Sequence, residues 1–298
     1  MQRAASTPRL GLLLFLSLLP LQPSLSYVVG VQSAFAAESV SQPVVGVRGD
    51  PFAQESESLS VVSLPPVWAS PWGANSSLLR KVQQLRVFAD SKDFVDSPLL
   101  VSREEVWRAW AALEDSPSLS LPTLTSFVNE HFGPPGSDLQ NCSLPDFSPT
   151  PPASIQSLSS PRLRQWASAL HSQWPSLARC PIPSVRHSPE RHTLLWADRP
   201  LVVPGGRFRE NYMWDSLWIC QGLVRSNMAV TAQGIVHTLA ELIATHGFIP
   251  NGGRSYYSAP GRSQPPVFSS VVWEVVRSTG DLDLLEATFE SMSTEYGA

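Results

Sequence analysis

Charged side chains are scarce in this 298-residue sequence, at 15% of all residues, and the formal net charge is only −4. Surfaces that bind nucleic acids need a clustered excess of basic residues. No such cluster is present, so no nucleic-acid partner is expected. Hydrophobic residues make up 43% of the chain, which is enough to build a sizeable core in one or two domains.

Long apolar runs are missing after the N-terminus, so no later segment is long enough to anchor this chain in a membrane. The apolar run at residues 10–21 is too short to span a bilayer comfortably and follows two arginines. Small residues follow at 34–36, with an earlier possible cleavage site at 24–26. We therefore expect residues 1–36 to be a signal peptide and the mature protein to be secreted or lumenal in the secretory pathway.

Cysteine is rare as well, and its three residues allow at most one disulfide within the chain. Cys142 and Cys180 flank a flexible region and are able to bridge, whereas Cys220 lies in an apolar helical pattern typical of a buried thiol. Asn75 and Asn141 each begin a glycosylation acceptor sequence. Both features agree with a secretory compartment.

Motifs for metals and nucleotides are also missing. The six histidines show no HExxH-type spacing, so the sequence predicts no metal site. The Gly205-Gly206 pair lacks the lysine and hydroxyl residue of a phosphate-binding loop. We therefore expect no metal and no other cofactor.

Helical periodicity dominates the rest of the chain, and no strand alternation of comparable length interrupts it, which predicts an all-α fold. Residues 37–65 are polar without a period and are expected to form a loose lead-in to a domain that spans residues 66–298. Residues 145–161 are rich in proline and serine, which predicts a surface insertion with extended or disordered backbone.

The sequence predicts several helices in the N-terminal half of the chain. Residues 78–88 carry apolar side chains near helical spacing, and residues 90–100 follow as a polar turn with an extended exit. Ser102 and Glu105 form a capping box that begins the next helix. A further helix is expected to end at Pro175. Its predicted apolar face consists of Leu163, Trp166, Leu170 and Trp174.

Four consecutive helices are predicted in the C-terminal half. The first spans residues 212–224, and Asn227 is expected to cap the second, which Gly247 ends. Prolines 265–266 suit the first turn of the third helix, and Asp281 begins the fourth.

Two polar stretches lead into the predicted helices. Residues 204–223 read PGGRFRENYMWDSLWICQGL, and residues 247–268 read GFIPNGGRSYYSAPGRSQPPVF. The second is long for a helix connection, which usually has about two to eight residues. We expect the two stretches to form two walls of one pocket, although Asn251-Gly252-Gly253 is also an ordinary turn signal.

The side chains of the first stretch suit a neutral polyhydroxylated ligand such as a sugar. Arg207 and Arg209 offer forked donors, and Trp214 offers a flat apolar face beside the Asp215 carboxylate. Each residue has an alternative interpretation. The arginines would then pair with Glu210 at the surface, and the tryptophan would belong to the core.

Both stretches resemble signatures of the α,α-trehalases, a family of glycoside hydrolases. PGGRFRENYMWDSLW is similar to the first signature of that family, and PNGGRSYY followed by RSQPPVF is similar to the next, with residues 258–261 slightly longer than usual. The similarity extends to VQQLRVFADSKDFVD and SFVNEHFGPPGSDL and covers most of residues 78–290. Residues 145–161 look like an insertion relative to the family.

The resemblance implies paired helices arranged as an (α/α)6 toroid, with trehalose as the small-molecule partner in a central pocket. It also implies an inverting mechanism, in which one carboxylic acid protonates the glycosidic oxygen and another activates water. The sugar-binding residues carried over from the family motifs are Arg207, Trp214, Asp215, Asn251, Arg262, Ser263 and Gln264.

The family's catalytic acid lies in a Glu-Ser-Gly-Trp-Asp motif and its base later still, and neither motif occurs before Ala298. We therefore expect the acid and base beyond Ala298, and the toroid to be incomplete at the C-terminus. Glu210 and Asp215 do not adjoin on one helix face and receive no catalytic role. The function that this resemblance implies is hydrolysis of trehalose to two glucose molecules. The alternatives are a non-catalytic sugar-binding remnant and a different helical-toroid hydrolase acting on another disaccharide.

Overall fold

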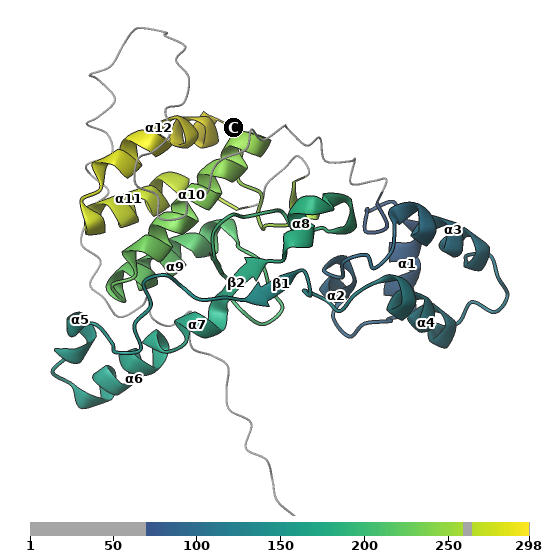
Figure 1. Ribbon diagram of the computed structural model, residues 1–298, viewed down its shortest axis with the longest axis horizontal. Coiled ribbons are helices and arrows are strands. Elements are labelled where there is room, and N and C mark those ends of the chain that lie inside the picture. Colours follow the sequence, from purple (N-terminus) through teal and green to yellow (C-terminus); the bar gives the residue numbers. More distant parts are fainter. Residues whose placement is uncertain (1–69, 259–263, 298) are drawn as a thin grey trace, which may run out of the picture. The chain divides into compact units, whose positions relative to one another are not determined.

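The computed structural model describes residues 70–258 and 264–297, and most of these residues lie in helices (Figure 1). The longer helices are α1 (Ser77–Gln84), α3 (Arg103–Leu113), α4 (Leu121–His131), α6 (Pro161–His171), α9 (Met213–Arg225), α10 (Ala229–His246), α11 (Phe268–Thr279) and α12 (Leu282–Gly297). The shorter ones are α2 (Ser91–Val95), α5 (Ala153–Gln156), α7 (Trp174–Leu177), α8 (Pro183–His187) and the 3₁₀ turns η4 (Pro189–Arg191) and η5 (Ser255–Tyr257). The prediction of a mainly helical fold is confirmed for the described residues. The predicted signal peptide and lead-in lie outside them.

Several helix ends lie where their residues predict them. The side chain of Ser102 accepts a hydrogen bond from the backbone N–H of Glu105 at 3.1 Å and begins α3. Gly247 and Gly280 end α10 and α11 in the left-handed conformation, with φ of 77° and 74°. Helix α9 begins at Met213, one residue from its predicted start.

The C-terminal helices α9, α10, α11 and α12 lie side by side (Figure 1). Helix α9 packs against both α10 and α11, and α12 packs against α10 and α11. The core between them includes the buried side chains of Val236, Leu239, Leu242, Ile243, Val271, Val272 and Val275. Because α9 and α11 are neighbours in this bundle, the two polar loops that precede them are also brought close together.

The start of α10 differs from the prediction. Asn227 has a φ of 60° and precedes the helix rather than capping it. The carboxylate of Asp146 instead accepts hydrogen bonds from the backbone N–H groups of Val230 and Thr231, at 2.7 and 3.2 Å. Asp146 belongs to the proline- and serine-rich segment 145–161, which has no buried residue but contains α5. The sequence had predicted a segment of extended or disordered backbone. In the structure the segment contains a short helix and is attached to the bundle.

Residues 90–100 also differ from the predicted polar turn, because they contain the short helix α2. The carboxylate of Asp90 caps this helix by accepting from the backbone N–H of Lys92 at 2.9 Å. Lys92 and Phe94 are both buried, and Phe94 belongs to a second apolar core formed with α1, α3 and α4. A helix of five residues is too short to produce a periodic pattern in the sequence.

The predicted apolar face of this region is only partly correct, because Trp174 is buried as predicted but lies in α7, beyond the end of α6. Leu163 and Trp166 are exposed at 50% and 39%, whereas Ala167 and His171 are buried. The proline- and serine-rich segment covers His171, whose ring stacks on Phe147 and whose Nε2 donates to the backbone carbonyl of Ser148 at 2.8 Å. The helix ends at His171, and Pro175 lies in the first turn of α7, which begins at Trp174, instead of ending α6. Likewise, prolines 265–266 precede α11, which begins only at Phe268.

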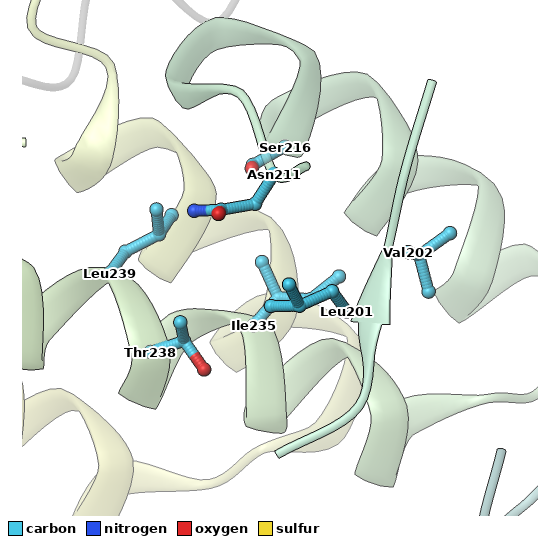
Figure 2. A pocket seen from close by; sticks show the side chains of 7 residues that line it. All are labelled: Leu201, Val202, Asn211, Ser216, Ile235, Thr238 and Leu239. Carbon is cyan, nitrogen blue, oxygen red and sulfur yellow. The ribbon is translucent and has the colours of Figure 1, made fainter. Parts of the chain in front are cut away.

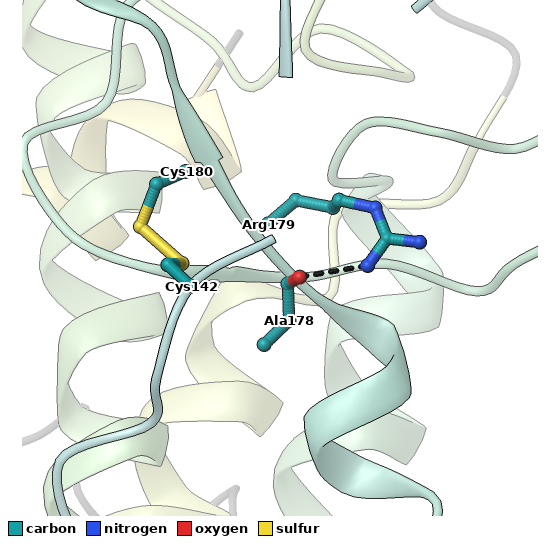
Figure 3. Close-up of a disulfide and its surroundings, with 4 residues drawn as sticks. All are labelled: Cys142, Ala178, Arg179 and Cys180. Atoms are coloured by element: carbon teal, nitrogen blue, oxygen red, sulfur yellow. Dashed lines mark hydrogen bonds between the residues drawn. A yellow bond between two sulfur atoms is a disulfide. The ribbon is translucent and has the colours of Figure 1, made fainter. Parts of the chain in front are cut away.

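A small antiparallel sheet, which the sequence did not predict, contains β1 (Leu139–Asn141), β2 (Ala178–Pro181) and β3 (Leu201–Val202) in that order. These strands are too short to show an alternating pattern. Cys180 of β2 forms a disulfide with Cys142, which follows β1, as predicted (Figure 3). Cys220 is a buried free thiol, also as predicted. The disulfide joins β1 to β2, and β3 leads directly into the first polar loop.

Candidate functional site

Two loops precede the neighbouring helices α9 and α11. Loop 1 is residues 204–212, and loop 2 is residues 248–267, of which 259–263 lie outside the described part. Gly205 and Gly206 adopt positive φ angles of 97° and 64°, which only glycine reaches without strain. Gly205 and Phe208 exchange backbone hydrogen bonds at 3.2 Å. The resulting tight turn presents the intervening arginine at the protein surface.

The backbones of the two loops are joined directly. The N–H of Met213, at the start of α9, donates to the carbonyl of Asn251 at 3.2 Å. The N–H of Gly253 donates to the carbonyl of Asn211 at 2.9 Å. The two stretches therefore lie side by side, and a pocket with these stretches as its walls stays a prediction.

Gly252 makes this close approach possible. It forms an isolated bridge with Tyr212, and a Cβ atom at Gly252 would lie 2.8 Å from the ring of Tyr257 and 2.9 Å from the ring of Tyr212. At these distances a Cβ atom would overlap with both rings, so no residue with a side chain fits at position 252. Glycine is therefore required here by contact with both tyrosines and not merely as a turn former.

Three of the predicted sugar-binding residues meet through hydrogen bonds. The backbone N–H of Trp214 donates to Oε1 of Gln264 at 3.0 Å, and the N–H of Gln264 donates to Oδ1 of Asn251 at 3.1 Å. Gln264 thus lies between the two loops and is held by both. Arg262 and Ser263, which precede it, lie outside the described residues.

Trp214 and Asp215 stand in the first turn of α9. The side chain of Trp214 is 48% exposed, so the alternative that it belongs to the core does not apply within the described chain. Asp215 is half-buried, and burial raises its pKa, although hydrogen bonds from its own backbone and from Trp214 act in the opposite direction. The site thus pairs an open aromatic face with a carboxylate that is partly withdrawn from water.

Arg207 is exposed and is held by one ion pair. Its Nη2 lies 2.6 Å from Oδ1 of Asp90, and its guanidinium lies over the ring of Phe208. The backbone N–H of Lys92, and then Arg207, lower the pKa of Asp90. Exposed ion pairs of this kind contribute only about 0 to 1 kcal/mol, so a ligand that offers better hydrogen bonds can compete for Arg207 at little cost.

Arg209 has a different position from Arg207. It binds the carboxylates of Asp93 and Asp96 at 2.7 and 2.9 Å and so ties loop 1 to α2. The alternative that both arginines pair with Glu210 is wrong, because Glu210 is fully buried and binds other partners. Arg209 is therefore an anchor of the loop, whereas Arg207 faces solvent.

Helix α2 contributes to the site although composition and periodicity did not reveal it. Its region supplies Asp90 to Arg207, and Asp93 and Asp96 to Arg209. The one signal in the sequence was the DSKDFVD segment, which resembles an early segment of the trehalases. Periodicity gave no such signal because the functional groups of this segment are charged and the helix is short.

A small cavity lies beside loop 1 (Figure 2). Its volume of about 10 Å3 is close to that of one water molecule and far below the roughly 300 Å3 of small ligand pockets. It is lined by Leu201, Val202, Asn211, Ser216, Ile235, Thr238 and Leu239. We assign it no role in sugar binding.

The described residues contain neither a cluster of metal ligands nor a membrane-spanning helix. In residues 70–258 and 264–297, no three side chains of histidine, cysteine, aspartate or glutamate are grouped so that they would hold a metal ion. None of the helices within these ranges combines the length and apolar character needed to cross a bilayer.

The fold and loops define a mainly helical protein with a surface of arginine, aromatic and amide side chains between two loops. Residues 86–298 match the trehalase family. The chain is 38% identical to the trehalase of Oryctolagus cuniculus and 37% identical to that of Homo sapiens, each over 235 residues. It is 39% identical over 228 residues to a probable trehalase of Oryza sativa subsp. japonica.

These alignments cover 78%, 78% and 74% of this chain but only 40%, 40% and 39% of the three relatives. The chain belongs to the trehalase family, and it spans about two fifths of the length of these curated relatives.

Proposed function

We propose that this chain is part of an α,α-trehalase and that loops 1 and 2 bind trehalose. The observation that carries the proposal is the pair of hydrogen bonds by which Gln264 joins Trp214 to Asn251. Three residues that family resemblance assigns to the sugar are thereby held together by direct contacts. Membership of the trehalase family supplies the identity of the sugar.

Each side chain has a role in this proposal that follows from its chemistry. The exposed guanidinium of Arg207 donates to sugar hydroxyls, and the open face of Trp214 packs against the apolar face of a glucose ring. Asp215 accepts from hydroxyls, and the amides of Asn251 and Gln264 donate and accept at the junction of the loops. Arg262 and Ser263 are proposed to complete the set on sequence grounds.

The proposed architecture is an (α/α)6 toroid to which α9, α10, α11 and α12 contribute. Large apolar side chains on the last two of these helices support it, since Trp273, Leu282 and Phe289 are exposed at 61%, 68% and 66%. Surfaces of this kind are typically covered by another element or partner. In the toroid, further helices of the trehalase would pack against them.

For catalysis, we propose the inverting mechanism, in which an acid and a base stand roughly 6.5 to 9.5 Å apart across the glycosidic bond. Glu210 does not serve in this pair, because its side chain is 0% exposed and is bound by Lys92 and Arg254. We therefore propose that the described part of the chain contributes sugar binding rather than the catalytic acid and base. The same observation favours, as a second candidate, a sugar-binding protein without hydrolytic activity.

One experiment separates these proposals. The native protein is captured with an antibody against residues 200–258, and glucose release from trehalose and from maltose is measured beside binding of each sugar. Release of glucose from trehalose supports the trehalase. Binding without release supports the second candidate, and preference for maltose in both assays overturns the choice of substrate.

We also propose that the protein is secreted or lumenal. The Cys142–Cys180 disulfide supports this, because disulfides persist in oxidising compartments. The acceptor residues Asn75 and Asn141 are both exposed, as glycosylation requires. Treatment of the native protein with an endoglycosidase should lower its apparent mass, and an unchanged mass together with reduced cysteines would contradict the proposal.

A further inference from the structure

Glu210 of loop 1 is at the centre of a buried group of charges. Its side chain is 0% exposed, and its Oε2 accepts hydrogen bonds from Nζ of Lys92 at 3.0 Å and from Nε of Arg254 at 3.1 Å. Its Oε1 accepts from the hydroxyl of Tyr212. One carboxylate therefore contacts α2, loop 2 and the last residue of loop 1.

The two cations that bind Glu210 are themselves fixed by other carboxylates. Arg254 binds Asp138 through two hydrogen bonds of 2.8 and 3.1 Å, and Lys92 lies 2.5 Å from Asp96. Burial acts to lower the pKa of Arg254, but Asp138, Asp96 and Glu210 raise it above its ordinary value. Arg254 thus stays charged, and Glu210 cannot turn without losing bonds on several sides.

The hydroxyl of Tyr212 continues this chain of contacts toward the protein surface. Tyr212 donates to the Glu210 carboxylate, which can only accept, and lies 3.3 Å from the hydroxyl of Tyr257. Since the Tyr212 proton is used by Glu210, the proton between the two tyrosines comes from Tyr257. The lone pairs of the Tyr257 oxygen are then left to accept from a ligand.

Tyr257 is half-buried and belongs to loop 2. Arg207 lies on the same side of Tyr212, because its guanidinium is placed over the ring of Phe208, which packs edge-on against Tyr212 with centroids 5.3 Å apart. Its ring packs edge-on against that of Tyr212, with centroids 5.9 Å apart. A Cβ atom at Gly252 would lie within 3 Å of both rings, so neither ring has room to tilt toward Gly252. The position and the hydrogen-bonding direction of Tyr257 are therefore both set from Glu210.

We propose that Glu210 is a positioning residue of the sugar site: its buried carboxylate clamps loop 1 to loop 2 and, through Tyr212, orients the hydroxyl of Tyr257 to accept from a sugar hydroxyl near Arg207. The inference rests on the proposed function, because the ligand is taken to be trehalose. General stability alone does not call for this arrangement, since well-packed apolar side chains often replace buried ion pairs without loss of stability. Apolar side chains in place of these charges would not orient the hydroxyl of Tyr257.

The test compares Tyr212→Phe with Tyr256→Phe. Both tyrosines donate to a buried carboxylate, Tyr212 to Glu210 and Tyr256 to Asp96, but only the first also contacts Tyr257 through its hydroxyl. Each variant removes one hydroxyl and keeps the ring, so both should fold. They form a matched pair for loss of one buried hydrogen bond.

Trehalose affinity is measured by calorimetry and thermal stability by scanning. We expect Tyr212→Phe to weaken trehalose binding by about fivefold to tenfold, as loss of one oriented hydrogen bond would. Both variants should lower the melting temperature by similar amounts, because each loses one buried hydrogen bond. Tyr256→Phe should leave the trehalose affinity unchanged. Equal losses of affinity in both variants, or unchanged affinity in Tyr212→Phe, would overturn the proposal.

A second readout does not need the ligand. Hydrogen exchange is followed at the N–H groups of Met213 and Gly253, which join the loops. Tyr212→Phe and Glu210→Gln should raise exchange there by roughly tenfold while the N–H of Gly247, at the end of α10, is unaffected. If the wild-type chain binds no trehalose but this pattern is found, the proposed function fails and the clamp stands. Unchanged exchange at Met213 and Gly253 rejects the clamp whether or not the sugar binds.

Discussion

The backbone N–H of Trp214 donates a hydrogen bond to Oε1 of Gln264 at 3.0 Å, across 50 residues of sequence. The first residue belongs to the start of α9, and the second to the loop that leads into α11. This bond is short enough to hold the aromatic face of Trp214 and the amide of Gln264 on one surface. Four predictions about that surface follow from its contacts.

Removal of the Gln264 side chain should weaken both the loop junction and the sugar site. Gln264→Ala leaves the N–H of Trp214 without its acceptor, which we expect to lower the free energy of unfolding by about 0.5 to 1.5 kcal/mol. Trehalose affinity should fall by about fivefold or more. Calorimetry and urea unfolding measure the two effects. Gln165→Ala on the exposed surface of α6 is the control, and an equal loss of affinity there would contradict the assignment.

Substitution of Arg207 should affect binding far more than stability. Arg207→Lys loses the forked pair of donors, so we expect trehalose binding to weaken by about tenfold to a hundredfold, while the free energy of unfolding changes by less than about 1 kcal/mol. Binding is measured by calorimetry and stability by urea unfolding.

Arg186 offers a matched control for Arg207. It also pairs with one exposed aspartate, Asp198, and its guanidinium also lies near an aromatic ring, that of Trp196. Arg186→Lys should leave trehalose affinity unchanged. Arg225, the last residue of α9, is less suitable as a control because it binds the buried Glu274 at 3.2 Å. A loss of affinity in Arg186→Lys as large as in Arg207→Lys would show that the effect is not specific to the loop site.

An added methyl group at Gly252 should separate the two loops. Gly252→Ala places a carbon atom within 3 Å of the rings of Tyr212 and Tyr257, and overpacking of this kind costs about 1 to 3 kcal/mol. We expect a lower melting temperature together with weaker trehalose binding. Gly297→Ala is the control, because a Cβ atom there meets nothing within 4 Å. Full stability of Gly252→Ala would show that the rings of Tyr212 and Tyr257 do not lie against Gly252.

Asp215 should lower the stability of the protein at neutral pH. Its folded-state pKa lies above the ordinary aspartate value of 3.8, chiefly because burial disfavours the charged form. The protonated carboxyl therefore contributes to the free energy of unfolding in full below pH 3.8. This contribution is lost as the pH rises through the folded-state pKa and is absent at neutral pH.

Asp215→Asn should accordingly be more stable than the wild type at pH 7, with the difference shrinking toward pH 3.8, and it should bind trehalose more weakly. Urea unfolding at several pH values measures the first effect and calorimetry the second. Asp115→Asn, in the exposed turn after α3, serves as the control. A less stable Asp215→Asn at pH 7 would show that the carboxylate is favourably bound in the folded protein.

The sequence predicted best those elements whose cause is local. Gly247 and Gly280 end their helices because only glycine enters the left-handed conformation easily, and this can be read from the residue itself. The two loops were found for a similar reason, since glycine, arginine and aromatic residues are dense within each stretch. Family resemblance then selected Arg207, Trp214 and Asn251 among the polar residues there.

The contacts that the sequence did not reveal have causes that are distant along the chain. Glu210 lies 118 residues from Lys92 and 44 from Arg254, so no local pattern shows that its carboxylate is buried. Trp166 was assigned to the core because it is apolar, but its neighbour Ala167 is buried instead. Which side of a short helix is covered depends on tertiary packing, and spacing alone did not determine it.

The central claim, that loops 1 and 2 bind trehalose, is tested most directly by calorimetric titration of the chain with trehalose, beside maltose and beside the Arg207→Lys variant. The account predicts saturable binding of trehalose to one site, weaker binding of maltose, and at least about tenfold weaker binding of trehalose to the variant. Absence of trehalose binding to the folded chain, or equal affinity in the wild type and Arg207→Lys, would contradict it.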